Sequence, residues 1–381
     1  MSTLRSRATF ARCAGLVLSA CLLGSSASAT WSIVVVDTRT NEVCLASATC
    51  LDGFPLKRNL GVVVVGKGAA AAQSSVDTTG VNRGIIWDML QAGFSPEQIL
   101  VRLETQGTGF QGRQYGIVSL PHDPVTFTGT FAGEAKYGVA ARMDDLSYAI
   151  QGNVLAGVLP VYAAEQALIS TPGDLSQKVI AAMEAARAAG GDGRCSCIPS
   201  QPTACGAPPP NMVYSAYTAF MVVARMGDVD GVCNQASGCA NGSYYCDLMA
   251  VSQINGPEPV LAMEQRYLLW RAKLAGFADH LRTLVAPQAS ALPADGQSAT
   301  EVDVQLVDVD GALADKTAVL VIEPTGAGPL GSVGAVVDHG GGHFSFPVVA
   351  GTTPGTATWK ITVRHHDREV RLWPDLAIEM Q

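Results

Sequence analysis

The segment Thr30–Val36 constrains the fold of this chain more than any other part of the sequence. It reads TWSIVVV, is rich in β-branched residues, and is nearly continuous in apolar character instead of alternating. A strand of this composition is typically buried on both faces, so packed layers must lie on either side of it. The polar stretch Asp37–Glu42 predicts a turn, and Val43–Cys50 predicts the returning strand.

The residues that follow predict strands and helices in blocks. Leu60–Gly66 and Ala69–Ser74 have the composition of another buried pair of strands. Two helices are expected next, and the second begins at Ser95, which is followed by Pro96 and Gln98 as in a capped helix start. We expect further strands at Tyr115–Leu120, Val125–Thr130, Leu146–Gln151, Val213–Arg225 and Asp247–Val251, and helices at Val154–Ile169, Leu175–Ala189 and Val260–Leu284. This order predicts an α+β fold of stacked sheets with helices outside.

The first 29 residues have the pattern of a secretory signal peptide. A cationic start without acidic residues is formed by Arg5, Arg7 and Arg12. Cys13–Gly24 is an apolar run too short to span a bilayer as a stable helix, and Ala27-Ser28-Ala29 supplies the small residues of a cleavage site. We therefore expect an exported protein, periplasmic or secreted, whose mature chain begins at Thr30.

A lipoprotein is the alternative form of export. Leu18-Ser19-Ala20-Cys21 has the form of a lipoprotein cleavage box, which would leave a lipidated Cys21 at the terminus. The stretch between Arg12 and Cys21 is short for that route, and the apolar run continues past it. The signal peptide of residues 1–29 is therefore favoured.

The cysteines after residue 29 predict disulfides. They are Cys44, Cys50, Cys195, Cys197, Cys205, Cys233, Cys239 and Cys246. An even number in an exported protein favours four disulfides, with Cys44–Cys50 as the candidate for a local bond. Zinc is the alternative at Cys195-x-Cys197, but structural zinc sites usually contain paired Cys-x-x-Cys motifs, which this sequence lacks.

The C-terminal residues predict a second, smaller domain. Ala286–Pro293 is rich in Pro and Ala, so residues 288–298 are expected to be a linker between residues 30–287 and residues 299–381. Beyond it, Val302, Val304 and Leu306 alternate with polar residues, as in a small β-sandwich. The motifs VQLVDVDG (304–311) and AGTTPGTA (350–357) resemble bacterial Ig-like group-1 domains of the invasin and intimin type. This resemblance implies a cell-envelope or surface partner.

Charge and histidine content exclude several classes of function. The net charge is −8 and no basic cluster contains aromatic residues, so a nucleic-acid partner is not expected. Residues 30–287 contain only His122 and His280, both expected at the surface, so a Ser-His-Asp triad or a histidine metal site lacks parts. Gly66-Lys67-Gly68 lacks the spacing of a phosphate loop. We expect no metal and no cofactor.

Cleavage after Ala29 would give Thr30 a free α-amino group beside its own hydroxyl. An α-amine has a pKa of about 8, compared with about 10.4 for a lysine, so a useful fraction is neutral at pH 7. The amine can accept the hydroxyl proton during attack on a carbonyl and return it to the leaving amine. One residue would then supply both nucleophile and base.

Three segments in order resemble the domain-of-unknown-function 1028 family. They are TWSIVVVD (30–37), YAIQGNVLAG (148–157) and AAGGD (188–192). The family has the Ntn-hydrolase αββα fold, so the resemblance implies a four-layer sandwich and an N-terminal threonine that cleaves an amide or peptide-like substrate. Carried over to this sequence, the catalytic residues would be Thr30, Gly152 and Asn153, and the substrate-binding residues would be Gln73, Ser74, Glu134, Gln151, Asp192 and Arg194. Asn153 or a backbone N–H would hold the oxyanion.

This chain departs from the family pattern near the expected site. Family members often have Ser-Lys where this chain has Thr49-Cys50, so a cation that would lower the pKa of the amine is missing there. Lys67 or Arg194 is the candidate to replace that charge. After Arg194, residues 195–210 stand where family members continue directly into a strand. The family's Asp-Leu-Arg-Val-Asp-Asp-His ending appears in this chain as DLMAVSQ (247–253).

These departures leave two alternatives to the hydrolase. One is a catalytically inactive Ntn-fold binding module that the Ig-like domain displays at the cell surface. The other is a purely structural exported protein.

Overall fold

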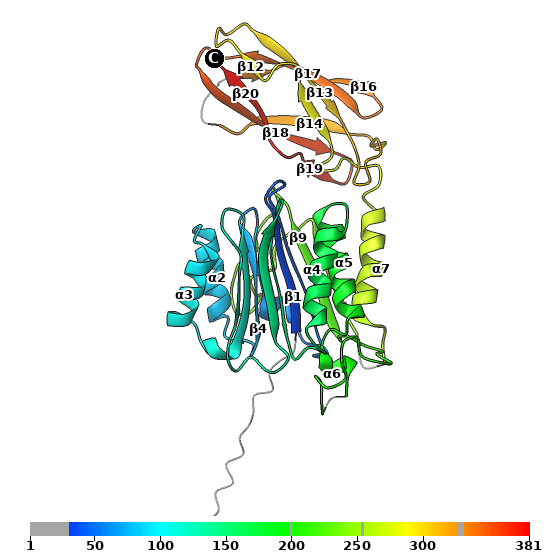
Figure 1. The fold of residues 1–381 in the computed structure, drawn as a ribbon. Coiled ribbons are helices and arrows are strands. Elements are labelled where there is room, and N and C mark those ends of the chain that lie inside the picture. The colour runs from blue at the N-terminus through cyan, green and yellow to red at the C-terminus, as the bar shows by residue number, and fades with distance from the viewer. Residues whose placement is uncertain (1–29, 199, 253–254, 327–330) are drawn as a thin grey trace, which may run out of the picture.

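A computed structural model describes residues 30–198, 200–252, 255–326 and 331–381 (Figure 1). The expected signal peptide and the Cys21 lipoprotein box lie outside the described residues. The apolar segment that begins at Thr30 forms a central strand of a six-stranded antiparallel sheet with the order β10-β9-β2-β1-β8-β7. The strands are β1 (Thr30–Asp37), β2 (Glu42–Thr49), β7 (Tyr137–Met143), β8 (Leu146–Asn153), β9 (Thr218–Ala224) and β10 (Cys246–Val251).

A second sheet of four strands packs against one face of the first. Its order is β3-β4-β5-β6, formed by β3 (Gly61–Val64), β4 (Gly68–Ser74), β5 (Arg113–Ser119) and β6 (Val125–Thr128). Between the sheets lies a core that includes Val34, Val36 and Leu45 from the larger sheet and Ala71 and Val118 from the smaller one. Ala69 and Ala71 of β4 present small side chains to this core, which suits close packing of the two sheets, whereas Ala70 and Ala72 face the helices on the other side.

Helices cover the outer face of each sheet (Figure 1). Ile86 of α2 (Val81–Gln91) and Leu103 of α3 (Pro96–Gln106) pack with Tyr115 and Ile117 of the smaller sheet. The larger sheet is covered by α4 (Leu159–Ser170), α5 (Leu175–Ala188) and α7 (Pro259–Ala272). The short helices are α1 (Leu56–Leu60), η1 (Phe110–Gly112) and α6 (Gly193–Ser196).

The β1 side chains divide between two cores. Trp31, Ile33 and Val35 pack under the helices, whereas Val34 and Val36 pack against the second sheet. The prediction of a strand buried on both faces is therefore confirmed. Every residue of β1 is buried, so the segment needs no polar face.

Two predicted helices were too long. The helix expected at Val154–Ile169 begins at Leu159, because Val154 has a φ of +50° and Leu155 bridges to Asp192 in the loop that follows β8. The helix expected at Val260–Leu284 ends at Ala272. Its last predicted residues belong to the connection that leads into the all-β part.

Residues 284–381 form two packed sheets. One has the order β11-β13-β17-β15 with β16 on β17, and the other has the order β12-β20-β18-β14 with β19 on β18. The strands are β11 (Leu284–Pro287), β12 (Ala291–Leu292), β13 (Ala299–Gln305), β14 (Val319–Pro324), β15 (Gly331–Val333), β16 (Val337–Gly340), β17 (His343–Ala350), β18 (Gly355–Arg364), β19 (Glu369–Arg371) and β20 (Leu376–Met380). Val304, Phe346, Trp359 and Ile378 lie in the core between them.

The stretch expected to be a linker does not separate the two parts as predicted. β11 pairs with β13, and β12 pairs with β20, so residues 284–292 already belong to the sheets of the all-β part. The Pro and Ala residues suggested a free connection, but two short edge strands accommodate them because such strands need few ladder hydrogen bonds.

Ion pairs join the two parts of the chain, and those of Arg225 are buried. Arg225 follows β9 and binds Glu42 at 2.6 Å and Asp279 at 3.0 Å, and Asp279 lies in the connection to the all-β part. Arg271 binds Asp174 at 2.8 Å and Asp310 of the all-β part at 3.1 Å. The two sheets of the all-β part are thus held at the end of the α/β part where β1 finishes.

The cysteines are paired differently from the prediction. Disulfides join Cys50 to Cys195, Cys197 to Cys205 and Cys233 to Cys239, whereas Cys44 and Cys246 are buried free cysteines. The expected Cys44–Cys50 bond is therefore wrong, and so is the count of four. Cys44 and Cys246 both lie beside Val223 of β9, one on each neighbouring strand. They are two strand spacings apart, about 9.6 Å, which exceeds the reach of a disulfide.

None of the helices among these described residues has the length and apolar character needed to cross a bilayer.

Candidate functional site

Thr30 lies at the beginning of β1, between the last residues of two neighbouring strands. In the register of the sheet it is opposite Thr49 of β2 on one side and Asn153 of β8 on the other. Its side chain lies on the same face of β1 as Ser32 and Val34, toward the smaller sheet, because side chains alternate along a strand. The Thr30 hydroxyl donates a hydrogen bond to the Thr49 hydroxyl at 3.2 Å.

The smaller sheet contributes Gln73 and Ser74 to the same place. Gln73 Nε2 donates to the Thr30 carbonyl at 3.0 Å and to Gln114 Oε1 at 2.8 Å, and Gln73 Oε1 accepts from the Ser32 hydroxyl. Ser74 is the last residue of β4 and has a φ of +74°, so the chain turns away at this point. Both residues therefore lie at Thr30, where the sequence placed them.

Asn153 reaches across to the smaller sheet. Its Nδ2 lies 3.4 Å from the Ser74 hydroxyl, and its side chain is fully buried. The next residue, Val154, has a φ of +50°, an unusual conformation for a β-branched side chain and one that often occurs at functional sites. The strand thus ends abruptly with an amide donor beside Thr30.

Gly152 and Gln151 occupy different positions from Asn153. A Cβ on Gly152 would lie 2.8 Å from the Leu155 side chain, so this position needs a glycine for packing, and the Gly152 carbonyl accepts from Gln114 Nε2 at 3.1 Å. Gln151 is opposite Ser32, two residues farther into the sheet than Thr30. The side-chain amide of Gln151 is buried over Gly116. Within the described residues, neither its Nε2 nor its Oε1 has a hydrogen-bond partner.

Asp192 and Arg194 approach Thr30 from the other side of the strand end. Asp192 is fully buried, caps α6, and accepts a hydrogen bond from the Cys50 N–H at 2.7 Å. Arg194 binds Asp192 with Nη2 at 2.8 Å and lies with the same nitrogen 3.4 Å from the Thr49 hydroxyl. A single hydroxyl therefore stands between the guanidinium and Thr30.

The remaining charged candidates lie elsewhere. Glu134 has an exposed side chain and contributes its carbonyl, which accepts from the Val154 N–H at 2.8 Å. Lys67 precedes β4 at the end opposite Ser74, where its ammonium binds the Gln91 carbonyl. Of the two cations considered as replacements for the missing lysine, Arg194 is the one beside Thr30.

Tyr217 lies next to this cluster. Its backbone N–H donates to the Thr49 carbonyl at 2.8 Å. Burial raises the pKa of Tyr217, and the neighbouring Tyr214, Asp52 and Asp192 raise it further. The phenol is therefore neutral near pH 7.

No role was predicted for Thr49 and Gln114, and Ser32 was considered only as an alternative nucleophile to Thr30. They form the hydrogen bonds that fix Gln73 and the Thr30 hydroxyl. Their only signal in the sequence is a polar residue at an inward position of an otherwise apolar strand.

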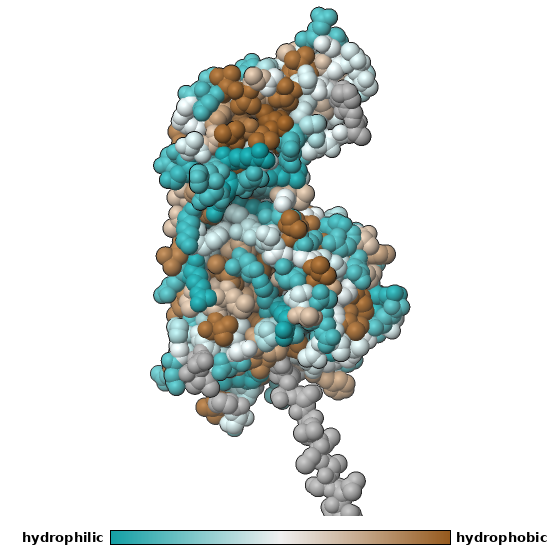
Figure 2. Space-filling model, turned by 180° about the vertical axis from the view of Figure 1, so that it is seen from behind, coloured by the Kyte–Doolittle hydropathy of each residue, from teal (hydrophilic) through white to brown (hydrophobic). Residues whose placement is uncertain are grey.

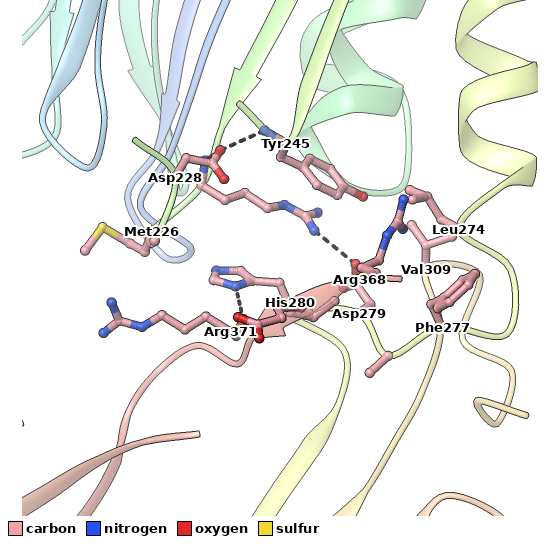
Figure 3. A pocket seen from close by; sticks show the side chains of 15 residues that line it. Met226, Asp228, Tyr245, Leu274, Phe277, Asp279, His280, Val309, Arg368 and Arg371 are labelled. Carbon is pink, nitrogen blue, oxygen red and sulfur yellow. Dashed lines mark hydrogen bonds and ion pairs between the residues drawn. The ribbon is translucent and has the colours of Figure 1, made fainter. Parts of the chain in front are cut away.

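A cavity of about 260 Å³ lies far from Thr30, at the opposite end of the strands (Figure 3). It is lined by residues of both parts of the chain, including Arg225, Tyr245, Asp279, His280 and Arg371. Arg225 is paired with Asp279 across it, and the His280 ring binds the Arg371 carbonyl. These groups mostly bind one another, so we assign the cavity to the junction and the candidate site to Thr30. Within the described ranges, no group of three or more His, Cys, Asp or Glu residues could hold a metal ion.

Two family models match the chain. Residues 30–200 match a family of unknown function, DUF1028, and residues 281–370 match domain 3 of invasin. Both resemblances drawn from sequence motifs are thereby confirmed. No curated protein matches this chain.

The chain is also similar to several solved structures. Protein SPO2555 from Silicibacter pomeroyi, a DUF1028 protein, is 21% identical over 64% of this chain and 86% of that chain, with a TM-score of 0.46. The Yersinia pseudotuberculosis adhesin InvE is 18% identical over 28% of each chain, with a TM-score of 0.22. Invasin, a bacterial integrin-binding protein, is 8% identical over 92% of this chain and 60% of that chain, with a TM-score of 0.21.

The chain is thus a mixed α/β unit followed by an all-β, invasin-like domain. Three disulfides together with that domain indicate an exported protein.

Proposed function

We propose that the α/β part is an N-terminal nucleophile hydrolase of the αββα type, in which Thr30 attacks an amide or peptide-like carbonyl. The observation that carries this proposal is the position of Thr30. It starts a central strand between two sheets, its hydroxyl faces the intersheet space, and polar groups from β2, β4 and β8 gather around it. The helices on both outer faces agree with the αββα order of layers.

The chemistry follows from the two groups that a terminal Thr30 would carry. The neutral α-amine takes the proton of the hydroxyl as the oxygen forms a bond to the substrate carbonyl carbon. The tetrahedral oxyanion is stabilised by a nearby donor, for which the Asn153 amide is the candidate. The protonated amine then gives its proton to the leaving amine, which leaves an ester on Thr30, and water hydrolyses the ester with the same amine as base.

The rest of the candidate set holds Thr30 in place. Gln73 fixes the Thr30 carbonyl, and Ser32 and Gln114 fix the Gln73 amide. We assign Ser74, on one side of Thr30, and Asp192 and Arg194, on the other side, to substrate binding. Glu134 stays in the proposal as a rim residue, and Gln151 and Gly152 as groups behind the nucleophile.

The first test is the N-terminus of the exported protein. Residues 1–29 should be absent and Thr30 should be the first residue, as read by intact mass and N-terminal sequencing. A lipidated Cys21, or a start two or more residues from Thr30, would remove the amine from the threonine and refute the mechanism.

The second test is covalent labelling of the processed protein with a β-lactone. The wild-type chain should form an ester at Thr30, Thr30→Ser should retain some labelling, and Thr30→Ala should lose it while keeping its fold. Thr38→Ala is the matched control, because it makes the same change just beyond the other end of β1, where the Thr38 hydroxyl donates to the Asp145 carbonyl. Labelling of the alanine variant at the parental rate would point to another nucleophile.

A binding module without catalysis is the second candidate function. It is favoured by the absence of the lysine expected after Thr49, where this chain has Cys50. In that case the processed, folded protein would form no adduct at Thr30. In both cases we propose that the invasin-like domain provides attachment to a cell-envelope or surface partner.

A further inference from the structure

The Cys50–Cys195 disulfide connects two short pieces of chain on either side of Thr30. Cys50 directly follows β2, whose last residue is Thr49, and Cys195 lies in the four-residue helix α6 directly after Arg194. The two cysteines are 145 residues apart in sequence. The bond therefore ties the residue after the Thr49 hydroxyl to the residue after the guanidinium that contacts it.

The polar contacts around this bond form one continuous path to Thr30. Asp192 accepts from the Cys50 N–H at 2.7 Å and from Arg194 Nη2 at 2.8 Å. Arg194 Nη2 in turn lies 3.4 Å from the Thr49 hydroxyl oxygen, which accepts from Thr30 at 3.2 Å. The Arg194 side chain is 21% exposed, so it is partly covered but not packed tightly enough to be fixed by burial alone.

We propose that the Cys50–Cys195 disulfide makes the Thr30 site dependent on oxidation, because it holds the Arg194 guanidinium beside Thr30. This inference rests on the proposed function and concerns the regulation of that same site. Arg194 acts as a positioning residue: it places a positive charge near Thr30. That charge takes the place of the lysine that family members often carry where this chain has Cys50. Arg194 is also held by two hydrogen bonds to Asp192, so we expect reduction of the disulfide to weaken this placement by loosening the α6 segment that carries both residues.

The physical effect falls on the Thr30 α-amine. A positive charge a few ångströms away disfavours the ammonium form and lowers the pKa of the amine. The Asp192 carboxylate, which is paired with Arg194, acts in the opposite direction and is present with or without the guanidinium. At the separation of one intervening hydroxyl, in a partly solvated site, the guanidinium itself would lower that pKa by about half a unit. This corresponds to an increase of about threefold in the neutral, reactive fraction below the pKa.

The experiment measures the Thr30 amine directly in the processed, full-length protein. The pH dependence of its reaction with an amine-selective acylating reagent gives its pKa without requiring turnover. Arg194→Gln should raise this pKa by about half a unit, and Arg194→Lys should restore most of the shift. Labelling of the hydroxyl by a β-lactone, measured at pH 6, should slow about threefold in parallel with the loss of neutral amine.

The disulfide is tested with a matched pair of double variants. Cys50→Ala with Cys195→Ala should shift the amine pKa in the same direction as Arg194→Gln. Cys233→Ala with Cys239→Ala removes a bond within one loop and should leave the pKa unchanged. The proposal is overturned if Cys50→Ala with Cys195→Ala has the circular dichroism spectrum of the wild type and its Thr30 amine keeps the wild-type pKa.

The two proposals fail in different ways. If the amine pKa responds as expected but no variant labels at the hydroxyl, the charge placement stands and the hydrolase is refuted. The opposite outcome is also possible. If Arg194→Gln and the double variant Cys50→Ala with Cys195→Ala label at Thr30 as fast as the wild type and keep its amine pKa, the hydrolase stands and the disulfide dependence is refuted.

Discussion

His280 should make the stability of this protein depend on pH below neutrality. It lies in the connection between the two parts, is 5% exposed, and binds the Arg371 carbonyl through Nδ1. The pKa of His280 is lowered from 6.5 to about 4, mainly by burial and then by the charges of Arg225 and Arg371, although Asp279 and the Arg371 carbonyl act in the opposite direction. The imidazole is therefore neutral in the folded protein near pH 7.

The sign of the effect follows from proton linkage. The unfolded chain binds a proton at His280 from about pH 6.5 downward, and the folded chain binds it only near pH 4. Stability is therefore fully present above pH 6.5 and is lost as the pH falls toward 4. The full difference is about 3 kcal/mol, of which about 2 kcal/mol should be lost between pH 7 and pH 5.

The assay is urea unfolding at pH 7 and pH 5, followed by tryptophan fluorescence. His280→Gln keeps a donor for the Arg371 carbonyl but cannot titrate, so its pH dependence should be smaller by about 2 kcal/mol. His365, whose pKa is also lowered by burial, remains in both proteins and cancels in the comparison. Equal pH dependence of the wild type and His280→Gln would refute the assignment of a buried neutral imidazole at the junction.

Two further predictions follow from the buried groups. Thiol counting on the denatured, unreduced protein without residues 1–29 should find two thiols, Cys44 and Cys246. Both thiols should be protected in the folded protein, because burial raises the pKa of each. A count of none or of eight would contradict the pairing. Arg225→Met should destabilise by about 3–5 kcal/mol because it leaves two buried carboxylates without their cation. Arg39→Met is the control, since the 67% exposed Arg39 should contribute about 1 kcal/mol or less, and equal losses in urea unfolding would show that the junction network adds nothing.

The buried strands and the position of Thr30 were predictable because their patterns are local. A continuous apolar segment such as Thr30–Val36 has few alternatives to a doubly covered strand, and the order of apolar blocks then places helices outside. The resemblance to the DUF1028 family also pointed to Asn153 and Asp192, which the structure places at the end of β8 and at the cap of α6.

The rest depends on contacts between residues that are distant in sequence. Nothing local distinguishes Cys50, which pairs over 145 residues, from Cys44, which lies on an inner strand out of reach of a partner. The edge strand Tyr137–Met143 was missed because it is only half-buried and carries a glycine and an arginine. His280 appeared to be a surface residue until the all-β part covered it.

The placement of the invasin-like domain has a consequence for how the protein could work at a surface. Its sheets sit on the end of the α/β part where β1 finishes, and Thr30 lies at the other end (Figure 1). The space-filling view shows the two parts as separate lobes with a polar waist between them (Figure 2). A partner bound by the far end of the invasin-like domain would therefore be separated from Thr30 by the length of the α/β part. Under the proposed function, one end of the molecule would bind a surface and the other end would act on diffusing compounds. The binding partner and the substrate could then be different molecules.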